Sequence, residues 1–168
     1  EFKNAKAALL PKKSERARVA VTASVYGTGG YGKTTLAQEL CLDEEVRDYF
    51  SGGIYWLDFG IQDSDADENE RQGYTARSAI DLMLQAAGYA NSARGLIARS
   101  NDNDAVNSLV SALPNEPVLL VADDLWTHSQ QHAFADLPKH VSVLVTTRVQ
   151  GLTPRFKESI RIKKFDDE

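Results

Sequence analysis

The sequence predicts a three-layer α/β fold in which helices cover both faces of a mainly parallel, five-stranded sheet. Short apolar segments alternate with amphipathic helical segments along the chain, and this alternation is typical of parallel strands joined by crossover helices. The apolar segments are continuous rather than alternately apolar and polar, as expected of strands buried on both faces. At 168 residues with 42% apolar residues, the chain has the size of one domain with its own core.

The first predicted strand and the first predicted helix flank a glycine-rich segment. Arg18 to Tyr26 reads RVAVTASVY, in which β-branched residues dominate and only small residues lie between them. Lys33 to Leu42 places Leu36, Ala37 and Leu40 on one helical face. The order of strand, loop and helix is therefore predicted for the first part of the chain.

The remaining elements follow in the same alternating order. Further strands are predicted over Ile54–Phe59, Pro117–Ala122, Val141–Thr146 and Ser159–Lys163, the last with the alternation of an edge strand. Helices are predicted over Thr75–Ala87, Asn103–Leu113 and Ser129–Phe134. Because ligands of such sheets bind at the carboxyl ends of the strands, we expect the polar residues at these ends to form a site.

Residues 27–34 read GTGGYGKT and satisfy the pattern GxxxxGK[ST] of a phosphate-binding P-loop. Glycines allow successive backbone N–H groups to point inward at the positive end of the following helix, where they bind an anion. Lys33 is predicted to contact the β- and γ-phosphates, and Thr34 is predicted to be a Mg²⁺ ligand. The predicted nucleotide-binding residues are Gly27, Thr28, Gly29, Gly30, Tyr31, Gly32, Lys33, Thr34 and Thr35.

Two acids follow the apolar segment PVLLVA, and an arginine follows VSVLVTT. Asp123 is predicted to hold the Mg²⁺ shell, and Asp124 to orient or deprotonate an attacking water. Adjacent strand residues face opposite ways, so the two acids need not share a role. The alternative is that the pair caps a helix beginning near Trp126. Arg148 is a candidate to sense the γ-phosphate, with a surface ion pair as its alternative, and the predicted catalytic residues are therefore Lys33, Asp124 and Arg148.

Composition excludes several kinds of function. The net charge of −5 argues against an extended nucleic-acid interface, which requires clustered Lys and Arg. No apolar run reaches the roughly 20 residues that span a bilayer, so we expect no membrane insertion. The single cysteine, Cys41, excludes an internal disulfide framework and suits a reducing compartment. We therefore expect a cytoplasmic protein.

Four ordered segments, VYGTGGYGKTTLAQEL, GIYWLDFG, PVLLVADDLW and VSVLVTTR, resemble the NB-ARC branch of the STAND nucleotide-binding domains. These domains occur in plant disease-resistance receptors, apoptosome scaffolds, and fungal and bacterial NOD-like proteins, which act in innate immunity and programmed cell death. The resemblance covers Arg18 to the end and implies a P-loop NTPase fold. It places the sensor strand, Val141–Thr146, between the P-loop strand and the Walker B strand. It also implies that Asp123 is associated with Mg²⁺, that Asp124 is the catalytic acid or base, and that Arg148 is the first sensor.

The resemblance implies an ATP/ADP switch with slow, Mg-dependent ATP hydrolysis and nucleotide-controlled self-oligomerisation of the full-length protein. We expect residues 1–17 to be an N-terminal linker or helix, with Glu1-Phe2 a possible cloning scar, and residues 18–168 to be the P-loop domain. The family continues into a small helical domain and a winged-helix domain, and this chain is expected to end before both. The guanine-reading [NT]KxD element of GTPases is absent from the sequence.

Two alternatives remain open at this point. One is a nucleotide-gated assembly module without significant hydrolysis in this isolated form. The other is a P-loop small-molecule kinase, although no segment resembles a lid that binds a phosphate acceptor. The sequence contains nothing that identifies the activating signal or the flanking sensor and effector domains.

Overall fold

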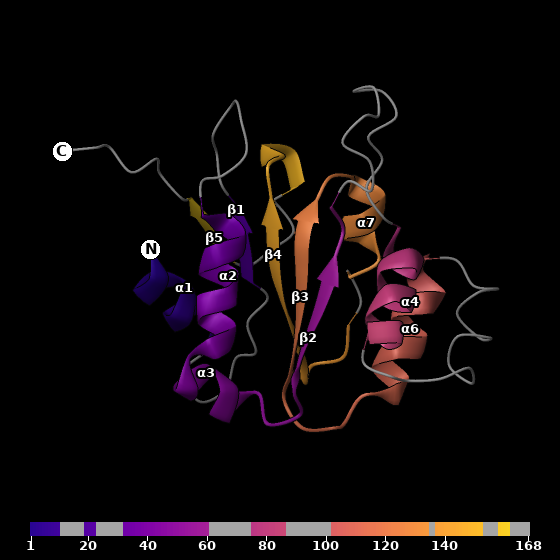
Figure 1. Ribbon diagram of the computed structural model, residues 1–168, viewed down its shortest axis with the longest axis horizontal. Helices are drawn as coiled ribbons and strands as arrows, with labels where there is room; N and C mark the ends of the chain where they lie inside the picture. The colour runs from indigo at the N-terminus through magenta and orange to yellow at the C-terminus, as the bar shows by residue number, and fades with distance from the viewer. Residues whose placement is uncertain are drawn as a thin grey trace.

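A computed structural model describes residues 1–10, 19–22, 32–60, 75–86, 102–134, 137–152 and 158–161. Within them, five strands form one sheet in the order β2-β3-β4-β1-β5, and every strand pairing in it is parallel (Figure 1). The strands are β1 (Val19–Thr22), β2 (Ile54–Asp58), β3 (Val118–Leu125), β4 (Val141–Thr147) and β5 (Glu158–Arg161). The helices are α1 (Phe2–Leu9), α2 (Lys33–Leu42), α3 (Glu44–Tyr49), α4 (Ala76–Ala86), α6 (Asp102–Ala112), α7 (His128–His132) and the 3₁₀ helix η1 (Gln150–Leu152).

The central strands β3 and β4 are buried on both faces, which explains their continuous apolar sequences. In β3, Val118, Leu120 and Ala122 pack into a hydrophobic core with helices α4 and α6. Leu119 and Val121 point the other way, into a second core with helices α1, α2 and α3. Figure 1 shows these two groups of helices on opposite sides of the sheet. The prediction of a sheet covered on both faces is therefore confirmed.

The strand order determines where the predicted site residues meet. β4 lies between β1 and β3, as the family resemblance implies. Because the strands are parallel, the carboxyl ends of β2, β3 and β4 lie at one edge of the sheet (Figure 1). Helix α2 contacts β1, β3 and β4, so its first turn is anchored near this edge.

Several predicted element boundaries need correction. The sequence predicted that the third strand ends at Ala122, but β3 continues through both aspartates to Leu125. The helix predicted over Ser129–Phe134 runs instead over His128–His132, because Thr127 caps it one residue earlier. Helix α3 was not predicted, since it is only 6 residues long. Residues 23–26 and 162–163 of the predicted strands lie outside the described residues.

The N-terminal helix α1 is packed into the domain. Ala5 and Leu9 are fully buried in the core beside α2. Lys6 forms ion pairs with Asp43 at 2.8 Å and Glu45 at 2.9 Å, and Asp43 also caps α3. The hydrogen bond from Lys6 lowers the pKa of Asp43. Of the helices that the structure describes, none has the length and apolar character needed to cross a membrane.

Candidate functional site

The predicted phosphate-binding lysine lies at the start of α2. Gly32 adopts a left-handed backbone conformation (φ +78°), which glycine tolerates without steric cost, and the helix begins at the next residue. Lys33 is 8% exposed. Burial lowers the pKa of Lys33 and the charge of Arg148 lowers it further, whereas Asp124 and Asp123 raise it. An anion bound beside Lys33 would therefore favour its charged form.

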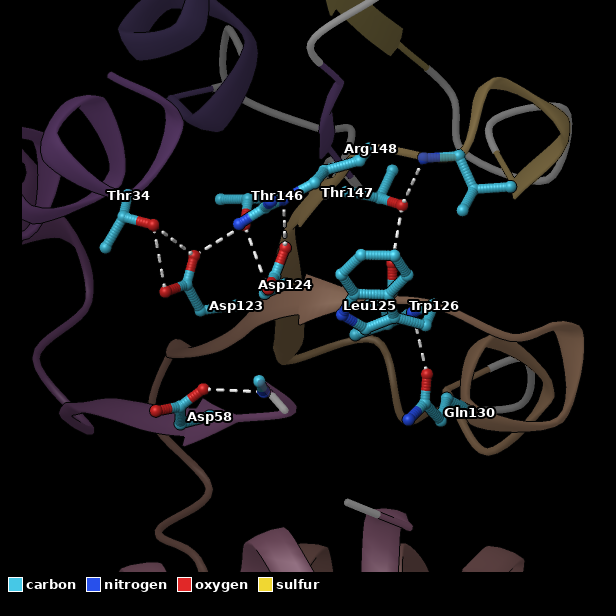
Figure 2. Close-up of polar contacts among 12 residues, drawn as sticks. Thr34, Asp58, Asp123, Asp124, Leu125, Trp126, Gln130, Thr146, Thr147 and Arg148 are labelled. Atoms are coloured by element: carbon cyan, nitrogen blue, oxygen red, sulfur yellow. Dashed lines mark hydrogen bonds and ion pairs between the residues drawn. The ribbon is translucent and has the colours of Figure 1, made fainter. Parts of the chain in front are cut away.

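Thr34 and Asp123 join α2 to β3. The Thr34 hydroxyl donates to both carboxylate oxygens of Asp123, at 3.1 and 3.2 Å (Figure 2). Asp123 is only 6% exposed. Hydroxyl and carboxylate oxygens are the protein ligands that Mg²⁺ prefers. The two residues predicted as metal ligands are therefore in direct contact.

A β-bulge at the end of β3 places the two aspartates. Ala122 pairs with Val145 and Leu125 pairs with Thr147, so Asp123 and Asp124 lie opposite a single residue of β4, Thr146. Asp124 has a left-handed conformation (φ +56°), which aspartate adopts more readily than most residues. The expectation that the two side chains face opposite ways is wrong, because the bulge interrupts the strand alternation and both acids line the same pocket.

The alternative reading of the aspartate pair as a helix cap is also wrong. Helix α7 is capped by Thr127, whose hydroxyl accepts from the Gln130 N–H at 3.2 Å. The Gln130 side chain in turn accepts from the N–H groups of Trp126 and Thr127, at 2.8 and 3.0 Å. This reciprocal capping leaves both aspartates available to the pocket.

Arg148 lies beside Asp124 and Trp126. Its Nε donates to Asp124 Oδ1 at 3.2 Å, and its guanidinium carbon lies 5.4 Å from the centre of the Trp126 ring (Figure 2). Thr147 fixes the segment on which Arg148 is carried, because its hydroxyl donates to the Leu125 carbonyl at 2.6 Å and accepts from the Val149 N–H at 3.0 Å. The ion pair proposed as the alternative for Arg148 thus exists, but with a residue of the site.

Asp58 is a site residue that the sequence analysis missed. It ends β2, pairs in register with Asp123, and lines the same pocket. The signal was available, since Asp58 is an acid at the carboxyl end of a predicted strand. Burial raises the pKa of Asp123 above its ordinary value of 3.8, hydrogen bonds from Thr146 and Thr34 lower it, and the neighbouring charges of Asp124 and Asp58 raise it.

All of the predicted site residues that the structure describes line one pocket. The residues lining it are Gly32, Lys33, Thr34, Thr35, Asp58, Asp123, Asp124 and Arg148. The other predicted residues, Gly27, Thr28, Gly29, Gly30 and Tyr31, lie outside the described residues. The pocket therefore combines a lysine from α2 and an arginine that directly follows β4 with acids from β2 and β3.

A parallel sheet covered by helices, with a lysine at a helix start facing acids at the strand ends, defines the class of α/β nucleotide-binding domains. The profile of the NB-ARC domain matches residues 3–167 of this chain. The chain therefore belongs to the NB-ARC family of nucleotide-binding domains. The match extends upstream of Arg18 and includes helix α1 except its first residue, Phe2.

The chain is also similar to a plant protein in sequence and to an archaeal protein in fold. The chain is 28% identical over 155 residues to a probable disease resistance protein of Arabidopsis thaliana, covering 88% of this chain and 17% of that protein. The chain thus spans about one sixth of the length of this relative. In fold it is similar to the ORC2 protein of Aeropyrum pernix, solved as ADPNP–ADP complexes, with a TM-score of 0.56 and 11% identity. That similarity covers 88% of this chain and 42% of the ORC2 chain.

Proposed function

We propose that this domain binds ATP and ADP with Mg²⁺ and acts as the nucleotide-dependent switch of a larger signalling protein, with slow hydrolysis resetting it. The observation that carries the proposal is the contact between Thr34 and Asp123, 89 positions apart in the sequence, in a pocket that also contains Lys33. A lysine and a threonine at a helix start, next to an acid at a strand end, match the chemistry of a triphosphate with its metal.

Three residues of the pocket bind the phosphates and the metal in the proposal. The Lys33 ammonium neutralises the β- and γ-phosphates. Thr34 and Asp123 would hold Mg²⁺. These residues fit the ion because the Thr34 hydroxyl oxygen on α2 lies 3.1 and 3.2 Å from the two carboxylate oxygens of Asp123 on β3, and Mg²⁺ prefers oxygen ligands. When bound, the ion supplies further neutralisation of phosphate charge.

The proposed hydrolysis depends on two further residues. Asp124 orients the attacking water and accepts its proton, and Arg148 compensates the negative charge on the γ-phosphate. Both stand at the pocket, and Arg148 is 44% exposed, so its guanidinium is accessible to a ligand. The two side chains are hydrogen-bonded through Asp124 Oδ1, and the second carboxylate oxygen can accept a proton from water.

The same contact favours a second candidate, a module that binds nucleotide and controls assembly without significant hydrolysis. If this ion pair persists while ATP is bound, the Asp124 carboxylate stays directed at Arg148 rather than at an attacking water. Phosphate release over multiple turnovers, measured for wild type and Asp124→Asn, separates the two candidates. A lower rate in the variant supports hydrolysis, whereas equal background rates favour the assembly module.

The binding proposal is tested by calorimetric titration of Mg-ATP, ADP and Mg-GTP into wild type and Lys33→Ala. We expect micromolar affinity for the adenine nucleotides, equivalent to about −8 kcal/mol, and loss of most of it in the variant. Lys139→Ala is the matched control, since Lys139 lies in the turn before β4, away from the residues that line the pocket. Equal affinities of wild type and Lys33→Ala would contradict the assignment.

Membership of the NB-ARC family and the similarity to a probable disease resistance protein support a proposal for the larger role of the domain. We propose that the full-length protein self-assembles when ATP replaces ADP. Size-exclusion chromatography with light scattering, on the full-length protein loaded with ADP or with a non-hydrolysable ATP analogue, tests this role. The same mass in both states would argue against it.

A further inference from the structure

Thr146 lies at the centre of the polar network but has no assigned role. It is fully buried in β4, directly opposite the bulge formed by Asp123 and Asp124. Its hydroxyl donates to Asp123 Oδ1 and accepts from the Asp124 N–H at 2.9 Å (Figure 2). One side chain thus contacts both acids, the first through its carboxylate and the second through its backbone.

The two hydrogen bonds require a hydroxyl in particular. A threonine hydroxyl can donate one hydrogen bond and accept others through its lone pairs. Here it donates to the Asp123 carboxylate and accepts from the Asp124 N–H. Valine has the same shape but offers neither. Without the acceptor, the Asp124 N–H loses its partner at the bulge, and a strand without a bulge would return adjacent side chains to opposite faces.

We propose that Thr146 is a positioning residue of the nucleotide site, whose hydroxyl maintains the bulge that directs both carboxylates into one pocket. Thr146 keeps Asp123 next to Thr34 and keeps Asp124 within reach of Arg148. The inference rests on the proposed function, because its effect is read through the metal and the nucleotide. Thr146 acts through Asp123 and Asp124, and it leaves Lys33 of the phosphate site unaffected.

The test compares Thr146→Val, which removes the hydroxyl, with Thr146→Ser, which retains it. Ser142→Ala is the control for losing a hydroxyl from the same buried strand at the end distant from the site. For each variant, nucleotide binding is titrated against Mg²⁺, ADP binding is measured without Mg²⁺, and phosphate release is measured in a single turnover. Thr146→Ala is a second hydroxyl-free variant in case valine prevents folding.

For Thr146→Val we expect about a tenfold rise in the Mg²⁺ concentration at half-maximal Mg-ATP binding and about a tenfold slower phosphate release, the usual scale for losing a group that orients a ligand of a metal. ADP affinity without Mg²⁺ should be unchanged, and Thr146→Ser and Ser142→Ala should resemble wild type. A wild-type Mg²⁺ dependence in both hydroxyl-free variants would overturn the inference. So would an equal loss of Mg-free ADP binding, because that result indicates general damage to the fold.

The wild-type titrations separate this inference from the proposed function. If wild type binds no nucleotide with or without Mg²⁺, the proposed function fails and the inference fails with it. If wild type binds Mg-ATP and the hydroxyl-free variants bind it with the same Mg²⁺ dependence, only the role of Thr146 is rejected.

Discussion

Arg148 Nε donates a hydrogen bond to Asp124 Oδ1 across 3.2 Å, so the two residues with proposed catalytic roles form an ion pair with each other. Asp124 is 17% exposed and Arg148 is 44% exposed. A γ-phosphate in the pocket would compete with the carboxylate for the guanidinium. ADP lacks this group, so the pair is expected to distinguish the two nucleotides.

Arg148→Ala should therefore weaken ATP binding and leave ADP binding nearly unchanged. A hydrogen bond to a charged group contributes roughly 1.5 to 3 kcal/mol, so we expect a loss of about tenfold or more in ATP affinity. Isothermal titration of both nucleotides measures the difference. A parallel loss for ATP and ADP would show that Arg148 does not read the γ-phosphate.

The Trp126 ring should support this discrimination by orienting the guanidinium. A cation–π contact at a partly exposed site contributes roughly 0.5 to 1 kcal/mol, so Trp126→Leu should weaken ATP binding by roughly twofold to fivefold. Trp126→Phe keeps an aromatic face and should retain most of the affinity. Trp126 Nε1 is buried with no hydrogen-bond partner among the described residues, so phenylalanine removes no hydrogen bond seen there.

Asp123 should destabilise the unliganded fold at neutral pH. The pKa of Asp123 is raised in the folded state, mainly by burial. Its contribution to the free energy of unfolding is therefore most favourable below the ordinary pKa of 3.8 and is lost as pH rises through the folded-state pKa. Asp123→Asn removes this charge. Without nucleotide or Mg²⁺, the variant should melt above wild type at pH 8, and the difference in melting temperature should narrow as pH falls toward 3.8.

Differential scanning fluorimetry across this pH range measures the gap in melting temperature. The same variant should lose Mg-dependent nucleotide binding, since its amide is a poorer Mg²⁺ ligand than a carboxylate. A variant that melts below wild type at pH 8 would contradict the assignment of Asp123 as a residue retained for function at the expense of stability.

The Gly52-Gly53 turn before β2 should be sensitive to a single methyl group. A Cβ at Gly52 would lie 2.8 Å from Val118 Cγ2 and 2.9 Å from the Glu116 carbonyl oxygen. Overpacking of this kind costs roughly 1 to 3 kcal/mol, which Gly52→Ala should show as a lower midpoint of urea unfolding. Gly151→Ala is the matched control, since a Cβ there meets nothing within 4 Å. Equal midpoints for the two variants would contradict the prediction.

The parallel sheet was predictable because its strands carry continuous apolar sequences, whereas a strand with one face in solvent alternates between apolar and polar residues. The same pattern predicted that β3 and β4 are buried on both faces. The pocket was predictable in outline, because parallel strands bring their carboxyl ends to one edge and the polar residues of these strands lie there. Lys33, Thr34, Asp123, Asp124 and Arg148 all line it.

The bulge was not predictable from periodicity. An apolar run followed by two acids is typical of a strand that ends, and only the pairing with β4 shows that the strand continues with two residues opposite one. In the sequence, Thr146 does not differ from other β-branched residues of a strand, because its two hydrogen bonds depend on that bulge. Asp58 carries a signal in the sequence, an acid near the carboxyl end of a predicted strand, but only the register with Asp123 shows which neighbour it meets.

The sheet order has a consequence for the time at which the domain becomes able to bind its ligand. β1 is the first strand in the sequence, yet its two neighbours in the sheet, β4 and β5, are the last two. During translation, β1 and the glycine-rich segment after it leave the ribosome long before any strand with which β1 pairs. We therefore expect a growing chain to gain protection from nucleotide only after almost the whole domain has been synthesised.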